Sequence, residues 1–335
     1  MPEVAEGEWR IVSEADAVEG NGRYRKKFRK HFDLTNEGKK MRILVSGLLN
    51  TETTTAVRGF PVNYYPIDYT FFGIDTAVSG VAFNIAKALR TLGDEVRLTS
   101  MVGNDFPASY IQNELNEHGI STEHLRPVLR QTPSSVVLYD PEGKRQIYCD
   151  LKDIQETNYP FEANLLDDVD LVAACNINFN RPLLHLAKEA GKMIATDVHV
   201  LSDIYDEYNR EFMECADILF LSDENIGDDY QPFLWQLAHT YNCRIIVLGR
   251  GSKGAAIYLR ETNQIFEMPA VSVGQVVNTV GAGDALFSAF LHFYAKGNDA
   301  LGALYRAQVF AAHKITVSGA SKGFVTEEVV ERWCE

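Results

Sequence analysis

The stretch from Asn278 to Asp284 reads Asn-Thr-Val-Gly-Ala-Gly-Asp, and the residues that follow it, Ala-Leu-Phe-Ser-Ala-Phe-Leu, carry apolar side chains at helical spacing. This order predicts a loop that ends in a helix, with Asp284 at the helix N-terminus. The first N–H groups of a helix have no partner within it and lie at the positive end of its dipole. The sequence therefore predicts an anion site at this junction.

Phosphoryl transfer is the chemistry that such a junction can perform. Gly281, Ala282 and Gly283 form a candidate anion hole, because the glycines let the backbone approach a group whose charge lies on several oxygens. The carboxylate of Asp284 can accept the proton of an attacking hydroxyl, so it is the candidate catalytic base. The alternative is a flexible loop in which Asp284 serves only as a helix N-cap.

Two earlier segments accompany this motif. Residues 78–86 read Val-Ser-Gly-Val-Ala-Phe-Asn-Ile-Ala, and residues 101–106 read Met-Val-Gly-Asn-Asp-Phe. With the stretch 278–284 they make the chain, from about Met41 to its end, resemble the ribokinase-like (phosphofructokinase-B-type) family of carbohydrate and nucleoside kinases. The resemblance implies a phosphotransferase that uses ATP and Mg²⁺ on an alcohol acceptor, and it leaves a monovalent cation open as a further cofactor.

The rest of the chain alternates short apolar runs with helical patterns. Apolar runs occur at 96–102, 169–174, 193–196, 218–221 and 245–248, and helical spacing occurs at 81–92, 106–118 and 182–190. This alternation predicts an α/β fold with a mainly parallel central sheet flanked by helices, which is also the fold that the resemblance implies. Ligands of such sheets bind beyond the C-terminal ends of the strands.

Two regions depart from the alternation. The segments on either side of Pro141-Glu142-Gly143 predict a β-hairpin, and residues 50–73 are strand-prone. The resemblance implies that strands from about 50–73 and 134–150 form a small β lid over the substrate, often shared across a homodimer. Five aromatic residues of the first region are expected mostly in core or interface packing, with one or two facing the substrate: Tyr64, Tyr65, Tyr69, Phe71 and Phe72.

Residues 1–40 differ in composition from the rest of the chain. The first twenty residues are acidic, and the next twenty are rich in Lys and Arg with few apolar residues. We expect a leader that is an extension or a loosely attached segment, followed by a kinase domain over 41–335. A basic interaction arm is the alternative.

The acceptor side of the site follows from the resemblance. Asn50 and Glu52 match the family's Gly-x-x-Asn-x-Asp segment, with Glu52 one methylene longer than the usual Asp. A carboxylate can accept two hydroxyl hydrogen bonds, which suits a vicinal diol. Gly80 and Asn84 belong to the Gly-Gly-x-x-x-Asn segment, and Asn84 can bind the same diol. The alternatives are a helix cap for Asn84 and a surface carboxylate for Glu52.

The nucleotide side is expected near Ser222 and the loop Gly249-Arg250-Gly251-Ser252-Lys253-Gly254. The loop matches a dinucleotide fingerprint, but the residues after it predict a returning strand rather than a helix, which argues against a Rossmann site. It resembles the family's Thr-x-Gly-x-x-Gly turn beside ATP, with Gly249 in the threonine position. His313 lies near the expected adenine site, although a lone histidine there is more often packing. Asp197, His199 and other polar residues at strand ends receive no individual role.

The segment expected to organise magnesium departs from the family's pattern. Where the family has Asn-x-x-Glu, the chain reads Ser222-Asp223-Glu224-Asn225. Asp223 and Glu224 are candidate ligands, acting through water on Mg²⁺, or they cap the segment that follows.

Composition limits the partners. The 335 residues carry a net charge of −14, which disfavours nucleic acid or an anionic membrane as the partner, and five scattered cysteines indicate reduced thiols in a cytoplasmic protein. We therefore expect a kinase for a monosaccharide or a sugar-like small molecule. A nucleoside kinase is the nearer alternative, and a non-catalytic ligand-binding regulator is the more distant one.

Overall fold

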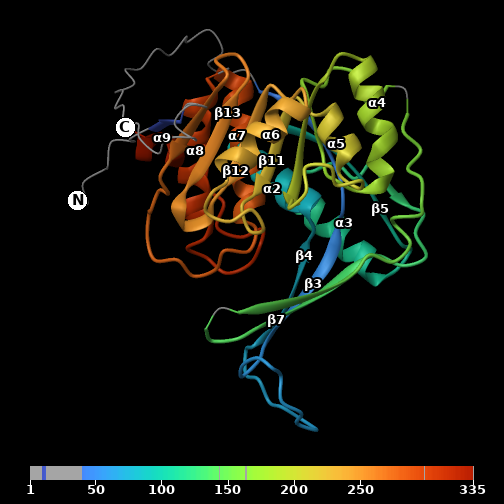
Figure 1. Cartoon of the computed structure of the whole chain (residues 1–335). Coiled ribbons are helices and arrows are strands. Elements are labelled where there is room, and N and C mark those ends of the chain that lie inside the picture. The colour runs from blue at the N-terminus through green and yellow to red at the C-terminus, as the bar shows by residue number, and fades with distance from the viewer. Residues whose placement is uncertain (1–9, 13–39, 143, 163, 298, 335) are drawn as a thin grey trace.

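The computed structural model describes residues 10–12, 40–142, 144–162, 164–297 and 299–334. Its large sheet has ten strands in the order β1-β14-β13-β12-β11-β10-β9-β2-β5-β6 (Figure 1). The strands from β12 to β6 in this order pair in parallel, and β13, β14 and β1 add antiparallel pairs at the other edge. Their bounds are β1 Arg10–Val12, β2 Arg42–Ser46, β5 Glu95–Val102, β6 Leu125–Pro127, β9 Leu171–Ala174, β10 Met193–Val200, β11 Ile218–Ser222, β12 Ile245–Gly249, β13 Ala255–Leu259 and β14 Gln264–Met268.

Helices cover both faces of this sheet, as the alternating pattern predicts. On β2, Ile43 and Val45 pack with α2, α3, α7 and α8, whereas Leu44 between them packs with α4, α5 and α6 on the opposite face. None of the helices in the described residues has the length and apolar run needed to cross a membrane. Their bounds are α2 Val81–Leu92, α3 Phe106–Glu117, α4 Arg181–Glu189, α5 Arg210–Cys215, α6 Gln231–Thr240, α7 Ala282–Gly297, α8 Ala300–Lys314 and α9 Glu327–Cys334, with 3-10 turns at η2 Asn178–Asn180 and η3 Gly251–Lys253.

A second sheet forms the lid, with four strands in the order β4-β3-β7-β8. The bounds are β3 Asn50–Ala56, β4 Ile74–Ser79, β7 Ser134–Tyr139 and β8 Arg145–Asp150. Strands β7 and β8 pair in antiparallel register, so the predicted hairpin is confirmed. The lid projects from the body of the molecule below the large sheet (Figure 1).

The loop between β3 and β4 differs from the prediction. Residues 57–73 contain no strand, because Gly59, Pro61, Pro66 and Gly73 interrupt the strand-prone pattern. The five aromatic side chains of this loop are exposed and do not pack into the core of the chain, with exposed fractions of 47% for Tyr65 and 75% to 107% for the others. Packing within the chain was therefore the wrong expectation for them, and interface packing remains.

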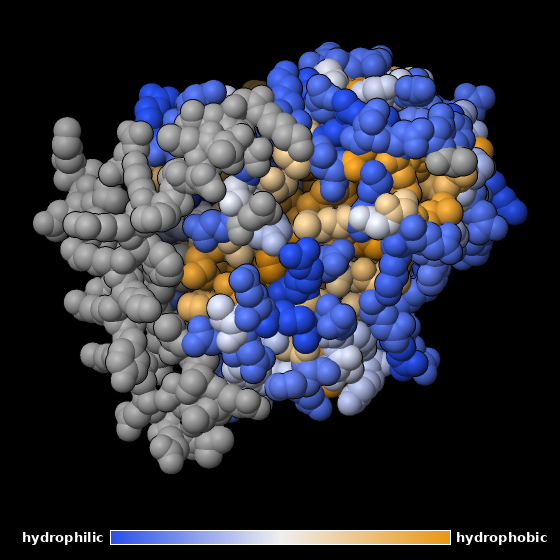
Figure 2. All heavy atoms as spheres, turned by 90° about the horizontal axis from the view of Figure 1, so that it is seen from above, coloured by the Kyte–Doolittle hydropathy of each residue, from blue (hydrophilic) through white to orange (hydrophobic). Residues whose placement is uncertain are grey.

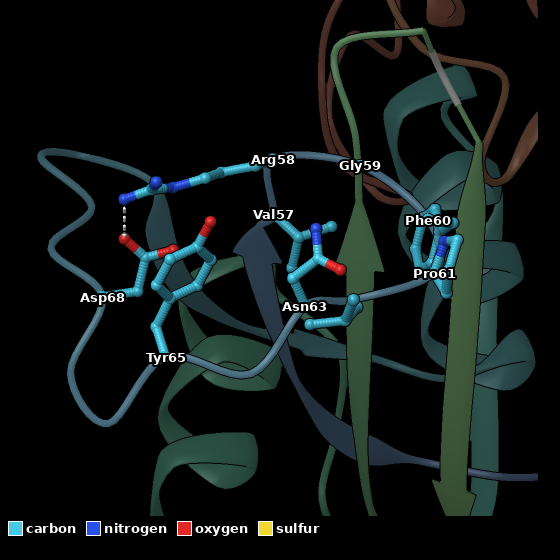
Figure 3. Close-up of a pocket in the computed structure, with 9 residues that line it drawn as sticks. Val57, Arg58, Gly59, Phe60, Pro61, Asn63, Tyr65 and Asp68 are labelled. Carbon is cyan, nitrogen blue, oxygen red and sulfur yellow. Dashed lines mark hydrogen bonds and ion pairs between the residues drawn. The ribbon is translucent and has the colours of Figure 1, made fainter.

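The lid loop also forms a pocket of its own. The pocket has a volume of about 230 Å³ and is lined by residues between Val57 and Asp68 (Figure 3). Across it the Arg58 guanidinium binds the Asp68 carboxylate at 2.6 Å and lies 4.5 Å from the centre of the Tyr65 ring. All of its lining residues belong to the lid loop, so the pocket does not include the candidate base Asp284.

Strand β1 falls inside the predicted leader. Arg10 to Val12 pair with Glu267 to Ile265 of β14, at the edge of the large sheet. The rest of the predicted leader, up to residue 39, lies outside the described residues. Figure 2 shows the molecule from above, on the side away from the lid, where hydrophilic residues surround apolar residues that reach the surface near the middle of the coloured part.

Candidate active site

Asp284 lies in the first turn of α7, as the sequence predicts. The helix begins at Ala282, so Asp284 is inside the first turn rather than before it. Gly281 precedes the helix with φ of 77°, and a Cβ there would lie 2.3 Å from the Ala320 carbonyl oxygen. Only glycine fits this approach between the loop and residue 320, which holds the start of α7 in place.

The first turn of α7 presents free N–H groups. Ala282 N donates to the Thr279 carbonyl at 3.1 Å, so this amide of the predicted anion hole is already engaged. In the described part of the chain, the N–H groups of Gly283 and Asp284 donate to no acceptor. These two donors can therefore receive an anion at the positive end of the helix.

The Asp284 carboxylate is oriented by Asn84. Asn84 Nδ2 donates to Asp284 Oδ2 at 2.7 Å, although the two residues are 200 positions apart. Asn84 lies within α2, whose N-cap is Gly80, so Asn84 does not cap the helix. Its Oδ1 is buried and has no partner among the described residues, which leaves an acceptor for a ligand hydroxyl. A Cβ on Gly80 would lie 2.4 Å from the Leu48 oxygen, so glycine allows α2 to start here.

Burial raises the pKa of Asp284, and the neighbouring charge of His199 and the Asn84 amide act in the opposite direction. His199 lies at the end of β10 with φ of 60°, a left-handed conformation that is uncommon for histidine. The backbone N–H of His199 donates to Asp197 Oδ1 at 2.8 Å, and the Nδ1 atom of its ring lies 3.5 Å from Asp197 Oδ2. The Asp197 carboxylate raises the pKa of His199 to about 9, so the imidazole is positively charged at neutral pH.

The lid places Glu52 on the same side as Asp284. Glu52 lies on β3, where Ser79 Oγ donates to its Oε2 at 3.5 Å. Burial raises the pKa of Glu52, Ser79 and Ser135 oppose that change, and the charge of Asp284 adds to it. Asn50 Nδ2 donates to Ser135 Oγ at 3.0 Å, and its buried Oδ1 has no partner among the described residues. Glu52 is therefore half-buried beside the base rather than a surface carboxylate.

Ser222 and Gly249 are neighbours at the C-terminal ends of parallel strands. They pair directly in the register of β11 and β12. Gly251 starts the 3-10 turn η3, Gly254 follows it, and β13 then returns antiparallel to β12. The returning strand agrees with the argument against a Rossmann site. These residues lie on the side of the sheet where a nucleotide is expected.

Arg250 organises the predicted magnesium segment. Its Nη1 lies 3.1 Å from Glu267 Oε1, its Nε lies 3.8 Å from Asp223 Oδ2, and its guanidinium lies 4.1 Å from the centre of the Tyr230 ring. Glu224 is exposed, and no helix begins directly after it. The described residues contain no group of three or more His, Cys, Asp or Glu side chains that could hold a metal. Asp223 and Glu224 as ligands of Mg²⁺ stay a prediction.

His313 packs against α9. Its ring lies 5.4 Å from the Trp333 ring in an edge-on arrangement, and burial lowers its pKa. This contact favours the packing interpretation that the sequence left open, and a contact with adenine stays a prediction.

Sequence reasoning missed three features of the site. The loop motif includes Arg250 but does not show its three partners, and the strand-end position of His199 does not show its charge or backbone strain. Lys314 at the end of α8 looks like an ordinary surface lysine in the sequence, yet it is fully buried. Only His199 had a signal in the sequence, which is its position at the end of a buried strand, since polar residues there are frequent at ligand sites.

Comparisons with known proteins show to which family the chain is similar. A model described as pfkB family carbohydrate kinase matches residues 43–327. The chain is 23% identical to fructosamine kinase FrlD of Bacillus subtilis, over 77% of this chain and 89% of that protein. It is 26% identical to a nucleoside kinase of Methanocaldococcus jannaschii, over 82% and 92% respectively. The solved structure of a microbiome-derived acarbose kinase, Mak1, has a TM-score of 0.79 and 24% identity, covering 89% of this chain and 100% of that one.

Proposed function

Because this chain belongs to the pfkB family of carbohydrate kinases, we propose that it transfers the γ-phosphoryl group of ATP to a hydroxyl of a monosaccharide or a sugar-like small molecule. The family and the curated relatives are phosphotransferases with alcohol acceptors. The observation that carries the proposal is the Asp284 carboxylate, held by Asn84 at 2.7 Å beside free N–H groups of α7. A base and an anion site next to each other are what in-line transfer to a hydroxyl requires.

Asp284 is the proposed catalytic base. The hydrogen bond from Asn84 fixes the carboxylate, and burial brings its pKa closer to the operating pH, which favours proton transfer from an alcohol. The N–H groups of Gly283 and Asp284 then stabilise charge on the transferring group without reorganisation. His199 adds a positive charge on the same side of the sheet.

The acceptor is proposed to lie between Glu52 on the lid and Asn84 on α2. Glu52 can accept hydrogen bonds from two hydroxyls, and the free Oδ1 atoms of Asn84 and Asn50 can accept others. Buried acceptors without partners are costly unless a ligand satisfies them, which supports a polyhydroxylated acceptor. Gly80 keeps the start of α2 close to this position.

ATP is proposed to bind along Ser222, Gly249, Gly251 and Gly254. The residues present fit a nucleotide, because backbone amides at the glycine-rich turn and at the start of α7 can bind phosphate oxygens. Asp223 or Glu224 would hold Mg²⁺ through water, and the metal would neutralise phosphate charge. The ion pair between Arg250 and Asp223 limits direct coordination by that carboxylate.

A substrate panel tests the proposal. The purified protein is incubated with MgATP and a set of monosaccharides, amino sugars, sugar derivatives and ribonucleosides, and ADP release is measured with and without each acceptor. We expect acceptor-dependent ADP release with at least one sugar-like compound. ADP release with ribonucleosides alone would favour the alternative function of a nucleoside kinase, which is the name of the relative from Methanocaldococcus jannaschii.

The variant Asp284→Asn is the control for this panel. We expect turnover to fall by roughly 10²–10⁴-fold, because the amide cannot accept the proton, while acceptor binding changes little. Turnover within a few-fold of the wild type would refute the assigned base. Binding of sugar and ATP by the wild type without ADP formation, measured by calorimetry, would instead indicate a non-catalytic regulator.

A homodimer through the lid is a second, separate proposal. The exposed rings of Tyr64, Tyr69, Phe71 and Phe72 gather on one loop, and exposed apolar groups of this kind mark interaction surfaces. The occupant we propose is the lid of a second copy of this chain. The monovalent cation and the cytoplasmic location expected from the sequence stay predictions.

A further inference from the structure

Lys314 is the last residue of α8, and it is fully buried, with an exposed fraction of 0%. Its Nζ atom has no hydrogen-bond partner among the residues that the structure describes. Lysine is almost never fully buried without a partner, because the ammonium loses its hydration. Packing alone therefore does not explain a lysine at this position.

The end of α8 lies beside the start of α7. The two helices form a hairpin in which α7 ends at Gly297 and α8 begins at Ala300, and they pack along their length (Figure 1). Directly after Lys314, the Ile315 carbonyl accepts hydrogen bonds from Val277 N at 2.8 Å and Asn278 N at 3.1 Å. Lys314 is thus adjacent in the chain to a residue that holds the loop leading into the anion hole.

A helix cap does not account for the buried ammonium. A cation at a helix C-terminus is favourable when it lies near the last carbonyls. In α8 the backbone serves this purpose, because Ile315 N donates to the Ala311 carbonyl and Thr316 N to the His313 carbonyl, each at 3.2 Å. Lys314 Nζ binds none of these carbonyls.

The charge that acts on Lys314 is Asp284. Burial lowers the pKa of Lys314 to about 8, and the Asp284 carboxylate on α7 opposes that change. The other charged groups near this end of α8 have different partners. His313 on the same helix packs against Trp333 of α9, and the ammonium of Lys322 in the following loop lies 3.4 Å from the Asp75 carboxylate on β4.

We propose that the Lys314 ammonium is a built-in positive charge behind the anion hole, and that the polyphosphate of a bound nucleoside triphosphate completes its neutralisation. The inference rests on the proposed function, since it needs phosphate at the start of α7. A fixed charge behind the free N–H groups of Gly283 and Asp284 attracts the transferring group without reorganisation, and burial weakens its screening.

Proton uptake on nucleotide binding tests this role without requiring turnover. A non-hydrolysable ATP analogue with Mg²⁺ is titrated into the protein by calorimetry in two buffers that differ in ionisation enthalpy. The arriving negative charge raises the pKa of Lys314, so near pH 8 the wild type should take up about half a proton per site. At a pH roughly two units lower Lys314 is already protonated, and its uptake should vanish.

The variants separate this role from a structural one. Lys314→Met should abolish the uptake and weaken analogue binding by roughly tenfold at neutral pH, and Lys314→Arg should restore the affinity. Lys188→Met, which changes an exposed lysine on α4, is the matched control and should behave as the wild type. The proton exchange of the analogue itself is common to all variants and cancels in the difference.

Each outcome decides one question. Equal proton uptake and affinity in the wild type and Lys314→Met would overturn the inference. If Lys314→Met does not fold, the inference is tested by the pH dependence of proton uptake in the wild type and by the analogue affinity of Lys314→Arg. A wild type without proton uptake near pH 8 would refute the inference. Failure of the wild type to bind the analogue at any pH would refute the proposed function instead.

Discussion

The two ends of α7 differ in whether their buried charges have partners of opposite charge within the protein. Toward its C-terminal end, His292 and Lys296 lie among carboxylates that neutralise them. At its first turn, Asp284 has the amide of Asn84 as its partner, and Lys314 nearby has none among the described residues. The same helix therefore carries one completed charge cluster and one incomplete cluster.

The completed cluster joins α7, α9 and the loop between α2 and β5. His292 Nδ1 lies 2.8 Å from Asp94 Oδ2, and its Nε2 lies 3.6 Å from Glu327 Oε2 on α9. Lys296 Nζ donates to both oxygens of Glu327, at 2.6 and 2.7 Å. His292 and Asp94 are each about 1% exposed. Each charge of this cluster has an opposite charge inside the protein, although His292 Nε2 makes no hydrogen bond to the described residues, so the cluster can hold α7 against α9 and the loop before β5.

In the incomplete cluster, which consists of Asp284 and Lys314, the charges are not matched in this way. Its carboxylate has a raised pKa and its lysine has a lowered one, so both prefer the neutral form more than they do in water. Bound phosphate and acceptor would change this preference. The comparison teaches that buried charge without protein partners marks the place where the substrate is expected to supply them.

Breaking the completed cluster should have the largest effect on stability. We expect Glu327→Gln to lower the free energy of unfolding by roughly 1–3 kcal/mol, because it removes the carboxylate of Lys296 and leaves His292 with Asp94 alone. Turnover should stay within about twofold, since the cluster is remote from Asp284. Urea denaturation and the ADP assay measure the two quantities.

The effect should also depend on pH. Burial alone would raise the pKa of Glu327, but His292 and Lys296 bring it down to about 2. Its contribution to stability is therefore present above its unfolded pKa of about 4.5 and is lost as the pH falls toward 2. The stability gap between wild type and variant should shrink in acid. Glu328→Gln, at an exposed neighbouring position, is the control, and an equal loss of stability there would remove the distinction between the clusters.

Sequence patterns predicted the frame of this molecule better than its charge clusters. The apolar runs and helical spacing of residues 81–92 or 245–248 are local properties, and the structure confirms the corresponding helix and strand. The strand expected through residues 57–73 was wrong after Ala56, because two prolines and two glycines outweigh aromatic β-propensity.

The site follows the same division between local and long-range information. The motif around Asp284 predicted a carboxylate at a helix start, and the structure confirms that position, since all parts of the motif are adjacent in sequence. The hydrogen bond from Asn84 joins residues 200 positions apart, and the sequence predicted a different partner for Asn84, the acceptor diol. The burial of Lys314 depends on how α7 and α8 pack, which no local pattern encodes.

Removing the charge of His199 beside the incomplete cluster should have a smaller effect, which appears in the pH profile of kcat. Its positive charge lowers the pKa of Asp284, so His199→Asn should raise that pKa and move the acidic limb of the kcat profile to higher pH. Asparagine tolerates the left-handed backbone at φ of 60°, so stability should change little. We expect kcat to fall about threefold to tenfold on the acidic limb and much less on the alkaline side of it.

The control for His199 is His185→Asn. His185 is an exposed residue on α4 whose Nε2 lies 2.7 Å from Glu211, so it tests the loss of a paired histidine away from the site. Its kcat profile from pH 5 to 9 should match that of the wild type. A pH-independent loss of kcat in His199→Asn would show that the residue acts through structure rather than through charge.

The lid loop gives the smallest expected change in the stability of the folded chain. Phe71 and Phe72 are 85% and 107% exposed, so the double variant Phe71→Ser/Phe72→Ser should change the free energy of unfolding of a monomer by less than about 0.5 kcal/mol. If the loop joins two copies of the chain, the same variant should convert a dimer into a monomer in light-scattering chromatography. Phe106→Ser, at an 83% exposed phenylalanine of α3 outside the loop, is the matched control and should leave the mass unchanged. A wild type that is monomeric at all concentrations would refute the lid dimer, because then no second copy of the chain covers these rings.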